Sequence, residues 1–120
     1  MSIIYEEITD RGLQIPLAIC KLAKLSDRAV INVFEGRIEV QSLEISKERA
    51  EMMANRHIIL HLGDSLVAGE GSLLENEGGI IWKVPVFHSR TGEKRGELYL
   101  SSESGAVLRY EPAQAVIQQP

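Results

Sequence analysis

Apolar and polar positions along the first third of the chain predict a strand, a short helix and a hairpin. Apolar and β-branched residues dominate Ile3–Thr9, and the turn cluster 10–12 follows them. Pro16 suits the first turn of a helix, whose apolar residues recur with one-sided spacing as far as Leu25. We therefore expect a strand at Ile3–Thr9 and a helix that ends before Ser26.

Two alternating segments follow and predict a tight β-hairpin. Ala29–Phe34 and Arg37–Gln41 flank the pair Glu35-Gly36, a sequence typical of a short turn. Ile38 and Val40 fall on one face of the second strand. Residues 42–45 are expected to form a linker.

The second half of the pattern predicts one helix and then an antiparallel meander. Ser46 is placed to cap a helix from Lys47 to about Leu62, and Gly63 is placed to end it. Its expected buried stripe is Ala50, Met53, Ala54, His57 and Ile58. After a Gly-rich stretch at 69–79, strands are expected at Ile80–Phe87, Gly96–Leu100 and Ala106–Tyr110. The predicted core or interface residues of these strands are Trp82, Val84, Val86, Leu98 and Leu100.

Composition narrows the functional classes. The formal net charge of −4 argues against nucleic-acid binding through bulk charge, although it leaves room for a local basic patch on a dimer. Cys20 is the single cysteine and excludes an internal disulfide. No apolar run approaches the ~20 residues that span a bilayer, and the first residues do not resemble a secretory signal. We therefore expect a cytoplasmic protein without a membrane partner.

The first third resembles the swapped-hairpin DNA-binding domains of the AbrB/MazE type. The match lies at Gly12, Ile15-Pro16, the short helix, the turn 26–28 and the hairpin segment 34–38. The resemblance implies an interlocked homodimer, or a higher even oligomer, that presents basic residues to double-stranded DNA. Carried over by position, it assigns DNA contacts to Arg11 and Lys21, with Lys24, Arg28 and Arg37 as further candidates.

The chain also departs from that family. The spacing from Gly12 to Pro16 is one residue short, and Cys20 stands where a second Arg is frequent. Glu6, Glu7 and Asp10 add acidic residues near the expected DNA face. The alternative is that Arg11, Lys21 and Lys24 only solvate a small dimer.

A second resemblance, to PepSY-type modules, covers residues 81–108. There a strand containing Trp82 precedes a Gly-x-Leu strand that begins at Gly96, and a turn ending at Gly105 follows. The plain alternative is a meander that packs on the preceding helix. The resemblance implies a protein partner for the C-terminal part of the chain, and no catalysis.

The segment 61–71 is similar to the nucleophile block of GDSL-type esterases, with Ser65 as the nucleophile. Such chemistry needs a base His oriented by a carboxylate. No Asp follows Asp64, and His88 is the only later His. A helix end at Gly63 followed by a polar turn explains the segment equally well. Ser65 esterase activity is the third functional hypothesis.

Neither metal nor phosphate chemistry has a complete motif. His57 and His61 stand four residues apart on the expected helix, as paired imidazole ligands do, but the sequence specifies no third ligand. The glycines at 69–71 and 78–79 are not followed by the Lys-Ser or Lys-Thr of a phosphate loop. We assign no catalytic, cofactor or metal residues.

Together these patterns predict an α+β protein in which a small swapped-hairpin-like β unit precedes a helix and a short antiparallel β-meander. The expected parts are residues 1–45 for dimerisation and DNA binding, 46–112 for the helix and meander, and 113–120 for a flexible tail. The leading hypothesis is a homodimeric, non-enzymatic transcription regulator, antitoxin-like in organisation. The alternative is a regulatory or protein-interaction module without DNA binding.

Overall fold

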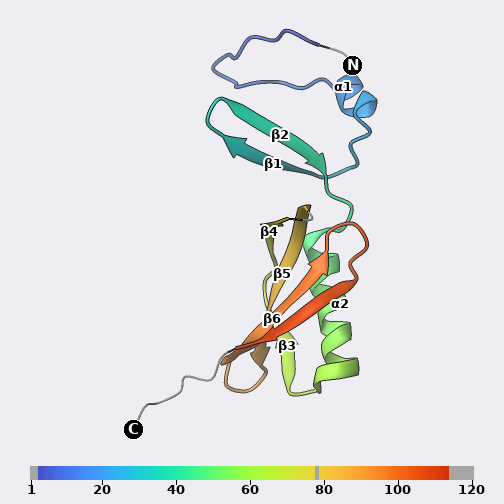
Figure 1. The fold of residues 1–120 in the computed structure, drawn as a ribbon, viewed down its shortest axis with the longest axis vertical. Helices are drawn as coiled ribbons and strands as arrows, with labels where there is room; N and C mark the ends of the chain where they lie inside the picture. The colour runs from blue at the N-terminus through green and yellow to red at the C-terminus, as the bar shows by residue number, and fades with distance from the viewer. Residues whose placement is uncertain (1–2, 78, 114–120) are drawn as a thin grey trace. The chain divides into compact units, whose positions relative to one another are not determined.

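The computed structural model describes residues 3–77 and 79–113 and has a mixed α+β fold with antiparallel strands, as predicted (Figure 1). The chain divides into two compact units, Met1–Ser42 and Leu43–Pro120, called here the N-terminal unit and the C-terminal unit. In chain order the elements are α1 Leu17–Leu22, β1 Ala29–Phe34, β2 Arg37–Ser42, α2 Lys47–His57, a π-helix Ile58–Leu62, β3 Leu66–Ala68, β4 Ser72–Asn76, β5 Gly79–His88, β6 Lys94–Ser101 and β7 Val107–Pro112.

The hairpin of β1 and β2 confirms the prediction for this segment. Gly36 provides the positive φ of 76° that the tight turn requires. Ile31 pairs with Val40 and Val33 pairs with Ile38 across the hairpin. Because side chains of directly opposed residues share a face, these four form one apolar face of the hairpin.

The helix α1 is shorter than predicted, because it ends at Leu22 and not near Leu25. Lys24 has a left-handed backbone with φ of 57°. The Lys24 N–H donates to the Lys21 carbonyl over 3.0 Å, and the Leu25 N–H donates to the Cys20 carbonyl over 2.9 Å. These bonds close the helix as a Schellman-type turn, in which Lys24 takes the place usual for glycine.

The strand predicted at Ile3–Thr9 is wrong for the single chain. Residues 3–8 have no regular structure, and the only pairing nearby is an isolated bridge between Thr9 and Gly12. A strand forms only where a neighbour satisfies its backbone groups, and no described strand pairs with this segment. The apolar and β-branched residues 3–8 therefore have no partner strand among the described residues of one copy.

The C-terminal unit contains a five-stranded sheet with β5 at its centre. The order is β3, β5, β6, β7, and β4 also pairs with β5. Because β6 occupies one edge of β5, β3 and β4 share the other, at residues 86–88 and 79–83 of β5. The strands predicted at 80–87, 96–100 and 106–110 are confirmed as β5, β6 and β7, whereas β3 and β4 were not predicted.

The core of the C-terminal unit lies between α2 and one face of this sheet. Register pairs Trp82 with Leu100 and Val84 with Leu98, so these side chains share a face. Every residue predicted for this core is buried, and so are the helix residues Ala50, Ala54 and Ile58 of the predicted stripe, while Met53 and His57 are half-buried. The main buried side chains are Ala50, Ala54, Ile58, Trp82, Val84, Val86, Leu98 and Leu100.

The ends of the second helix also follow the sequence. The Ser46 hydroxyl accepts a hydrogen bond from the Arg49 N–H over 3.2 Å, which confirms the predicted N-cap. The last turn widens into a π-helix, in which the Gly63 N–H donates to the Ile58 carbonyl over 2.8 Å. Gly63 ends the helix with a φ of 112°.

Part of the segment predicted as a linker belongs to the C-terminal core. Leu43 and Ile45 are both buried. The Ile45 N–H donates to the Ser102 carbonyl over 3.0 Å, and the Ile45 carbonyl accepts the Trp82 indole N–H over 2.9 Å. These bonds attach the chain to the sheet just before α2 begins.

Candidate functional site

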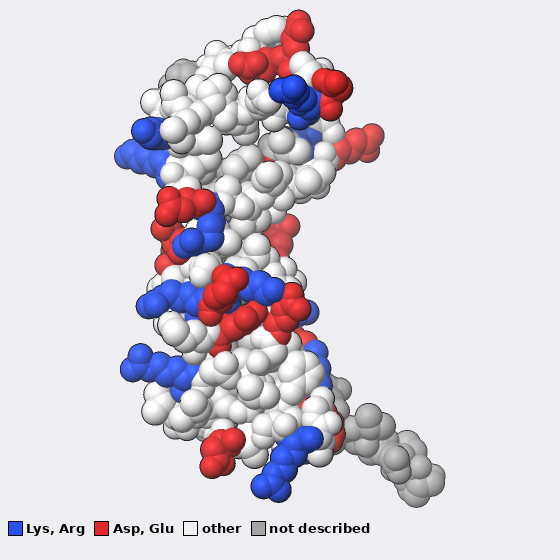
Figure 2. All heavy atoms as spheres, turned by 180° about the vertical axis from the view of Figure 1, so that it is seen from behind, with Lys and Arg blue, Asp and Glu red and all other residues white. Residues whose placement is uncertain are grey.

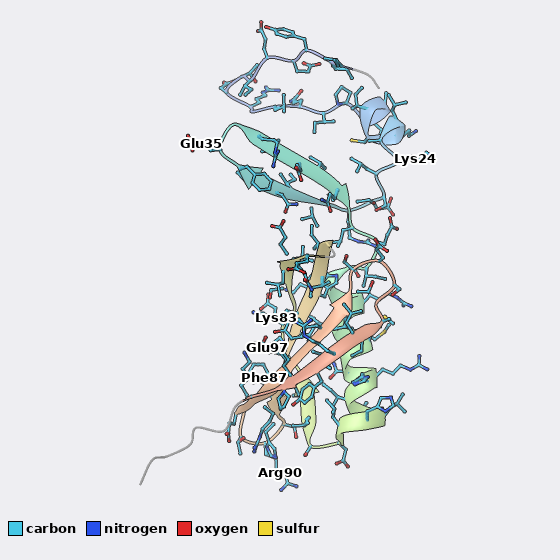
Figure 3. The ribbon with its side chains drawn as sticks, viewed as in Figure 1. Lys24, Glu35, Lys83, Phe87, Arg90 and Glu97 are labelled. Atoms are coloured by element: carbon cyan, nitrogen blue, oxygen red, sulfur yellow. The ribbon has the colours of Figure 1, made fainter. Side chains whose placement is uncertain are left out.

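The five predicted DNA-contacting residues are all the lysines and arginines of the N-terminal unit, where six acidic residues accompany them. Arg11 lies in the turn bridged by Thr9 and Gly12, and its N–H donates to the Thr9 hydroxyl over 3.2 Å. Lys21 lies in the last turn of α1, and Lys24 lies just after it (Figure 3).

Arg28 directly precedes β1, and Arg37 is the first residue of β2, just after the turn of the hairpin. The carbonyl of Arg28, just before β1, accepts the Ser26 hydroxyl over 3.3 Å. The guanidinium of Arg37 lies 4.6 Å from the centre of the Phe34 ring and 3.4 Å from the Glu39 carboxylate. Arg37 is thus partly engaged within the hairpin, although an exposed pair of this kind contributes little stability. Apart from Lys21 and Lys24, which lie three residues apart at the end of α1, the five residues come from separate segments.

Charge of one sign does not gather into a single patch on the one face of the molecule that Figure 2 draws. On the face drawn in Figure 2, basic and acidic side chains alternate with uncharged surface in both units.

The N-terminal unit has no core of its own among its described residues. None of residues 3–42 is buried, although the backbone of this part of the chain forms a compact unit. Twelve of its large apolar side chains are exposed, from 40% for Phe34 to 93% for Ile3. They are Ile3, Ile4, Tyr5, Ile8, Leu13, Ile15, Leu17, Leu22, Ile31, Val33, Phe34 and Ile38.

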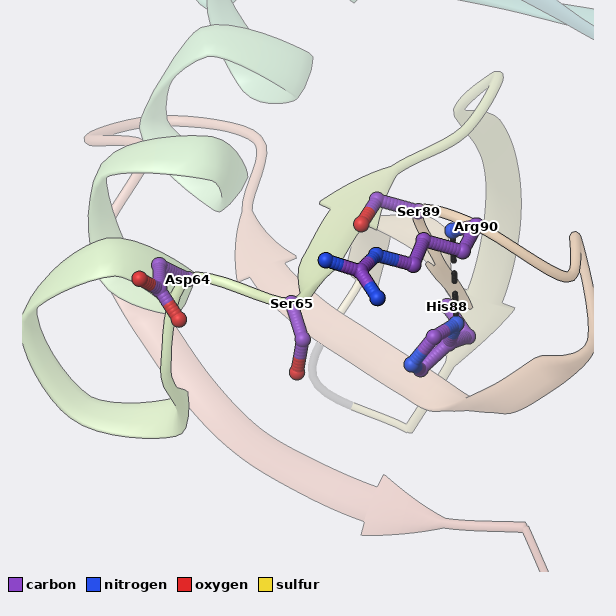
Figure 4. A pocket seen from close by; sticks show the side chains of 5 residues that line it. All are labelled: Asp64, Ser65, His88, Ser89 and Arg90. Carbon is purple, nitrogen blue, oxygen red and sulfur yellow. Dashed lines mark hydrogen bonds between the residues drawn. The ribbon is translucent and has the colours of Figure 1, made fainter.

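Ser65, the residue of the esterase hypothesis, lines a surface hollow of about 310 Å³ (Figure 4). Register pairs Leu66 of β3 with His88 of β5, so the turn before β3 meets the loop between β5 and β6. The Ser89 N–H donates to the Ser65 carbonyl over 2.8 Å and joins the two segments. The hollow is lined by Asp64, Ser65, His88, Ser89 and Arg90.

The His88 ring is not oriented as in a catalytic triad. Its Nδ1 accepts hydrogen bonds from the backbone N–H groups of Arg90 and Thr91, each over 3.3 Å. In the neutral ring the proton is therefore on Nε2, whereas a triad His carries it on Nδ1 and donates it to a carboxylate. No hydrogen bond joins Ser65, Asp64 and His88 to one another in the part of the chain that the structure describes.

The glycines of the esterase-like segment have a packing role that the sequence did not reveal. A Cβ on Gly69 would overlap the ring of Phe87. The Gly71 N–H donates to the Glu51 carboxylate over 2.7 Å, and the Ala68 N–H donates to the Asn55 side chain over 2.9 Å. Glu51 and Asn55, four residues apart on α2, thus satisfy backbone donors in the segment between β3 and β4. Their i, i+4 spacing is the one feature of the sequence that places both side chains on the same face of the helix.

His57 and His61 lie together at the end of α2. Their ring centroids are 4.7 Å apart. Burial, and then the charge of His61, lower the pKa of His57 below 6.5, so the ring favours its neutral form. Among the described residues no three His, Cys, Asp or Glu side chains are grouped to hold a metal ion. His57 and His61 line a groove of about 210 Å³ together with apolar residues such as Met53 and Val107.

A charged network, also not predicted, covers the sheet face that carries Lys83. Lys83 and Glu97 lie on neighbouring strands (Figure 3), 3.9 Å apart between Nζ and Oε2. Lys94 hydrogen-bonds to Glu97 and lowers the pKa of its carboxyl. The Tyr99 hydroxyl donates to Glu97 over 3.0 Å, and the Arg109 guanidinium lies 4.1 Å from the Tyr99 ring centre. The network satisfies polar groups on a face that α2 does not cover.

Comparisons with protein-family models, with curated proteins and with solved structures found no match for this chain. Across the residues that the structure describes, no helix is both long enough and apolar enough to cross a membrane.

Proposed function

We propose that the chain is a homodimeric DNA-binding transcription regulator, antitoxin-like in organisation, whose N-terminal unit completes its fold with a second copy. The observation that carries this proposal is the exposed apolar surface of that unit: twelve large apolar side chains and no buried residue in 3–42. The proposal assigns the chain no catalytic activity, and a DNA-binding role is consistent with the cytoplasmic location predicted from sequence.

The size of the unit supports this reading. Domains near 40 residues generally need a metal, disulfides or oligomerisation to be stable, and an isolated two-stranded hairpin is marginal at best. The unit has one cysteine, Cys20, and therefore no internal disulfide. Covering the apolar face of Ile31, Val33, Ile38 and Val40 with a second copy supplies the missing burial at about 25 cal/mol per Å². Residues 3–9 also gain a partner strand in such an arrangement.

DNA contact rests on the resemblance to AbrB/MazE-type domains together with the placement of the basic residues. Arg11 and Lys21 are the proposed contacts with phosphate or base edges, and Lys24, Arg28 and Arg37 are secondary. Pairing two copies doubles the number of basic side chains that one duplex meets. The overall charge of −4 makes local contacts, and not bulk attraction, the basis of binding.

The alternative is a protein-interaction module without a DNA role. A different protein could bind the same exposed apolar surface and bury it. The six acidic residues of the unit also outnumber its five basic ones, which does not favour DNA. Under this alternative the C-terminal unit, which has its own core, remains folded while the N-terminal unit binds the partner.

Fluorescence anisotropy tests the proposal. Labelled DNA from upstream of the protein's own gene is titrated with protein at two salt concentrations, with wild type, Arg11→Ala and Lys21→Ala. Arg49→Ala, a change of one basic residue on the exposed surface of α2, is the matched control. Because a homodimer carries each change twice, we expect each N-terminal variant to reduce the magnitude of the slope of log K against log salt by about 2, and the control to leave it unchanged.

Absence of binding at low salt to this DNA and to an unrelated duplex would reject the regulator proposal. Equal losses in Arg49→Ala and Arg11→Ala would reject the assigned contacts.

A further inference from the structure

The geometry of the hollow beside Ser65 points to a binding site for a small oxyanion, of the class of inorganic phosphate or a phosphate monoester. We propose that Arg90, the Nε2–H of His88 and the Ser65 hydroxyl are its donors. The site lies within the C-terminal unit and does not rest on the DNA-binding proposal.

Arg90 supplies a positive charge that the protein does not neutralise. Among the described residues no carboxylate lies within salt-bridge distance of it, whereas Arg95 on the same hairpin pairs with Glu93 over 3.7 Å. Asp64 also lines the hollow, but its carboxylate lies on the other side of Ser65 from His88 and Arg90 (Figure 4). A planar guanidinium without a carboxylate partner is suited to bind phosphate oxygens through two hydrogen bonds.

His88 is held as a donor toward the same space. Because its Nδ1 accepts the N–H groups of Arg90 and Thr91, the neutral ring carries its proton on Nε2. Figure 4 shows this other ring nitrogen turned toward the side of the hollow where Ser65 lies. The arrangement that prevents His88 from serving Ser65 as a triad base thus makes it a donor.

The loops that carry these donors are fixed by backbone hydrogen bonds. The His88 N–H donates to the Glu93 carbonyl over 2.8 Å, and the Gly92 N–H donates to the His88 carbonyl over 2.9 Å. The bond from Ser89 to Ser65 joins this loop to the turn before β3. These bonds fix the backbone that carries the donors, so only the side chains lose freedom when an anion binds. A volume of about 310 Å³ is at the lower end of the range for small-molecule sites and suits a compact anion.

Amide NMR spectra of the full chain, recorded during a titration with sodium phosphate at constant ionic strength, test the proposal. We expect saturable shifts confined to the residues that line the hollow. Arg90→Ala should weaken binding at least about tenfold, because it removes the charge-assisted hydrogen bonds of the guanidinium. Asp64→Asn should strengthen it by up to about fivefold, because it removes a carboxylate from the lining. Arg95→Ala is the matched control and should change the affinity less than about twofold.

Two further arms distinguish the sources of the anion. Phenyl phosphate, titrated in the same way, should bind at least as tightly as inorganic phosphate if the natural ligand is a phosphate monoester. Labelled duplex DNA, titrated with wild type and Arg90→Ala, should show the same affinity for both proteins.

Several results would overturn the inference. They are an absence of saturable shifts at millimolar phosphate, equal losses in Arg90→Ala and Arg95→Ala, or no phosphate binding together with weaker DNA binding by Arg90→Ala. The last result would assign Arg90 to nucleic acid. Circular dichroism of each variant checks that the sheet is intact, and the gain expected from Asp64→Asn cannot arise from misfolding.

Discussion

Trp82 donates its indole N–H to the carbonyl of Ile45 over 2.9 Å, within the buried core of the C-terminal unit. One bond thereby attaches the residues just before α2 to the central strand of the sheet. Replacing Trp82 with Phe keeps an aromatic ring but leaves the Ile45 carbonyl without its donor. We expect the free energy of unfolding to fall by about 1–3 kcal/mol, as for an unsatisfied buried acceptor. Urea unfolding followed by circular dichroism measures this loss, and an unchanged midpoint would contradict the role of the bond.

The core of the C-terminal unit should be sensitive to the loss of a single side chain. Leu98 is fully buried on the sheet face toward α2, whereas Leu108 on β7 is 52% exposed. We expect Leu98→Ala to lower the free energy of unfolding by about 2–5 kcal/mol and Leu108→Ala by less than about 1 kcal/mol. Chemical denaturation of both variants gives the comparison. Similar losses at the two positions would contradict the assignment of the core.

Gly69 lies against Phe87 so closely that a methyl group would overlap the ring. We expect Gly69→Ala to destabilise the C-terminal unit by about 1–3 kcal/mol. The cause is tested by the double variant Gly69→Ala, Phe87→Leu, in which a smaller side chain makes room for the methyl group. If the two changes were additive in a double-mutant cycle, the overlap would not be the cause.

The pH dependence of stability should report His57. Because burial and the charge of His61 lower the pKa of His57 in the folded protein, the unfolded state binds a proton more readily. The stabilising contribution is complete above pH 6.5 and is lost as the pH falls from there through the folded-state pKa. We expect His57→Gln to flatten the curve of unfolding free energy between neutral and mildly acidic pH. An equally steep curve in this variant would rule out His57 as the group responsible, and His88→Gln serves as the control.

The apolar hairpin face should be covered by a second copy. Val33 lies on that face and is 78% exposed in the single chain, whereas Asn32 points to the opposite face of the same strand. We expect Val33→Asp to raise the dimer dissociation constant more than about tenfold, because a carboxylate would be buried in the interface. Asn32→Asp should leave it nearly unchanged. A wild-type chain that stays monomeric at micromolar concentrations would refute this dimer.

Patterns confined to neighbouring residues were sufficient to predict much of the fold. The turn at Gly36, the cap at Ser46 and the alternation around Trp82 depend on local preferences, and the corresponding elements were predicted correctly. The strand at Ile3–Thr9 was wrong because a strand also needs a neighbour, which no single-copy pattern supplies. β3 and β4 were missed because Gly69 and Gly71 indicated a loop.

The candidate anion site could not be predicted from a motif. Ser65 and His88 come together only through the register of β3 with β5, which pairs Leu66 with His88. The orientation of the His88 ring depends in turn on the backbone of Arg90 and Thr91. The sequence pattern indicated Ser65 as an esterase nucleophile and marked His88 only as the single later histidine, but the orientation of the ring does not serve that chemistry. The DNA contacts at Arg11 and Lys21 stay predictions.

Sedimentation velocity of a fluorescently labelled duplex, observed through its dye with and without excess protein, tests the central claim most directly. The duplex is taken from upstream of the protein's own gene, and the run is made at low salt. We predict a faster boundary with a mass of one duplex and two chains, or a higher even number, that reverts to free duplex at high salt. A duplex that sediments as free DNA at every protein concentration would contradict the claim.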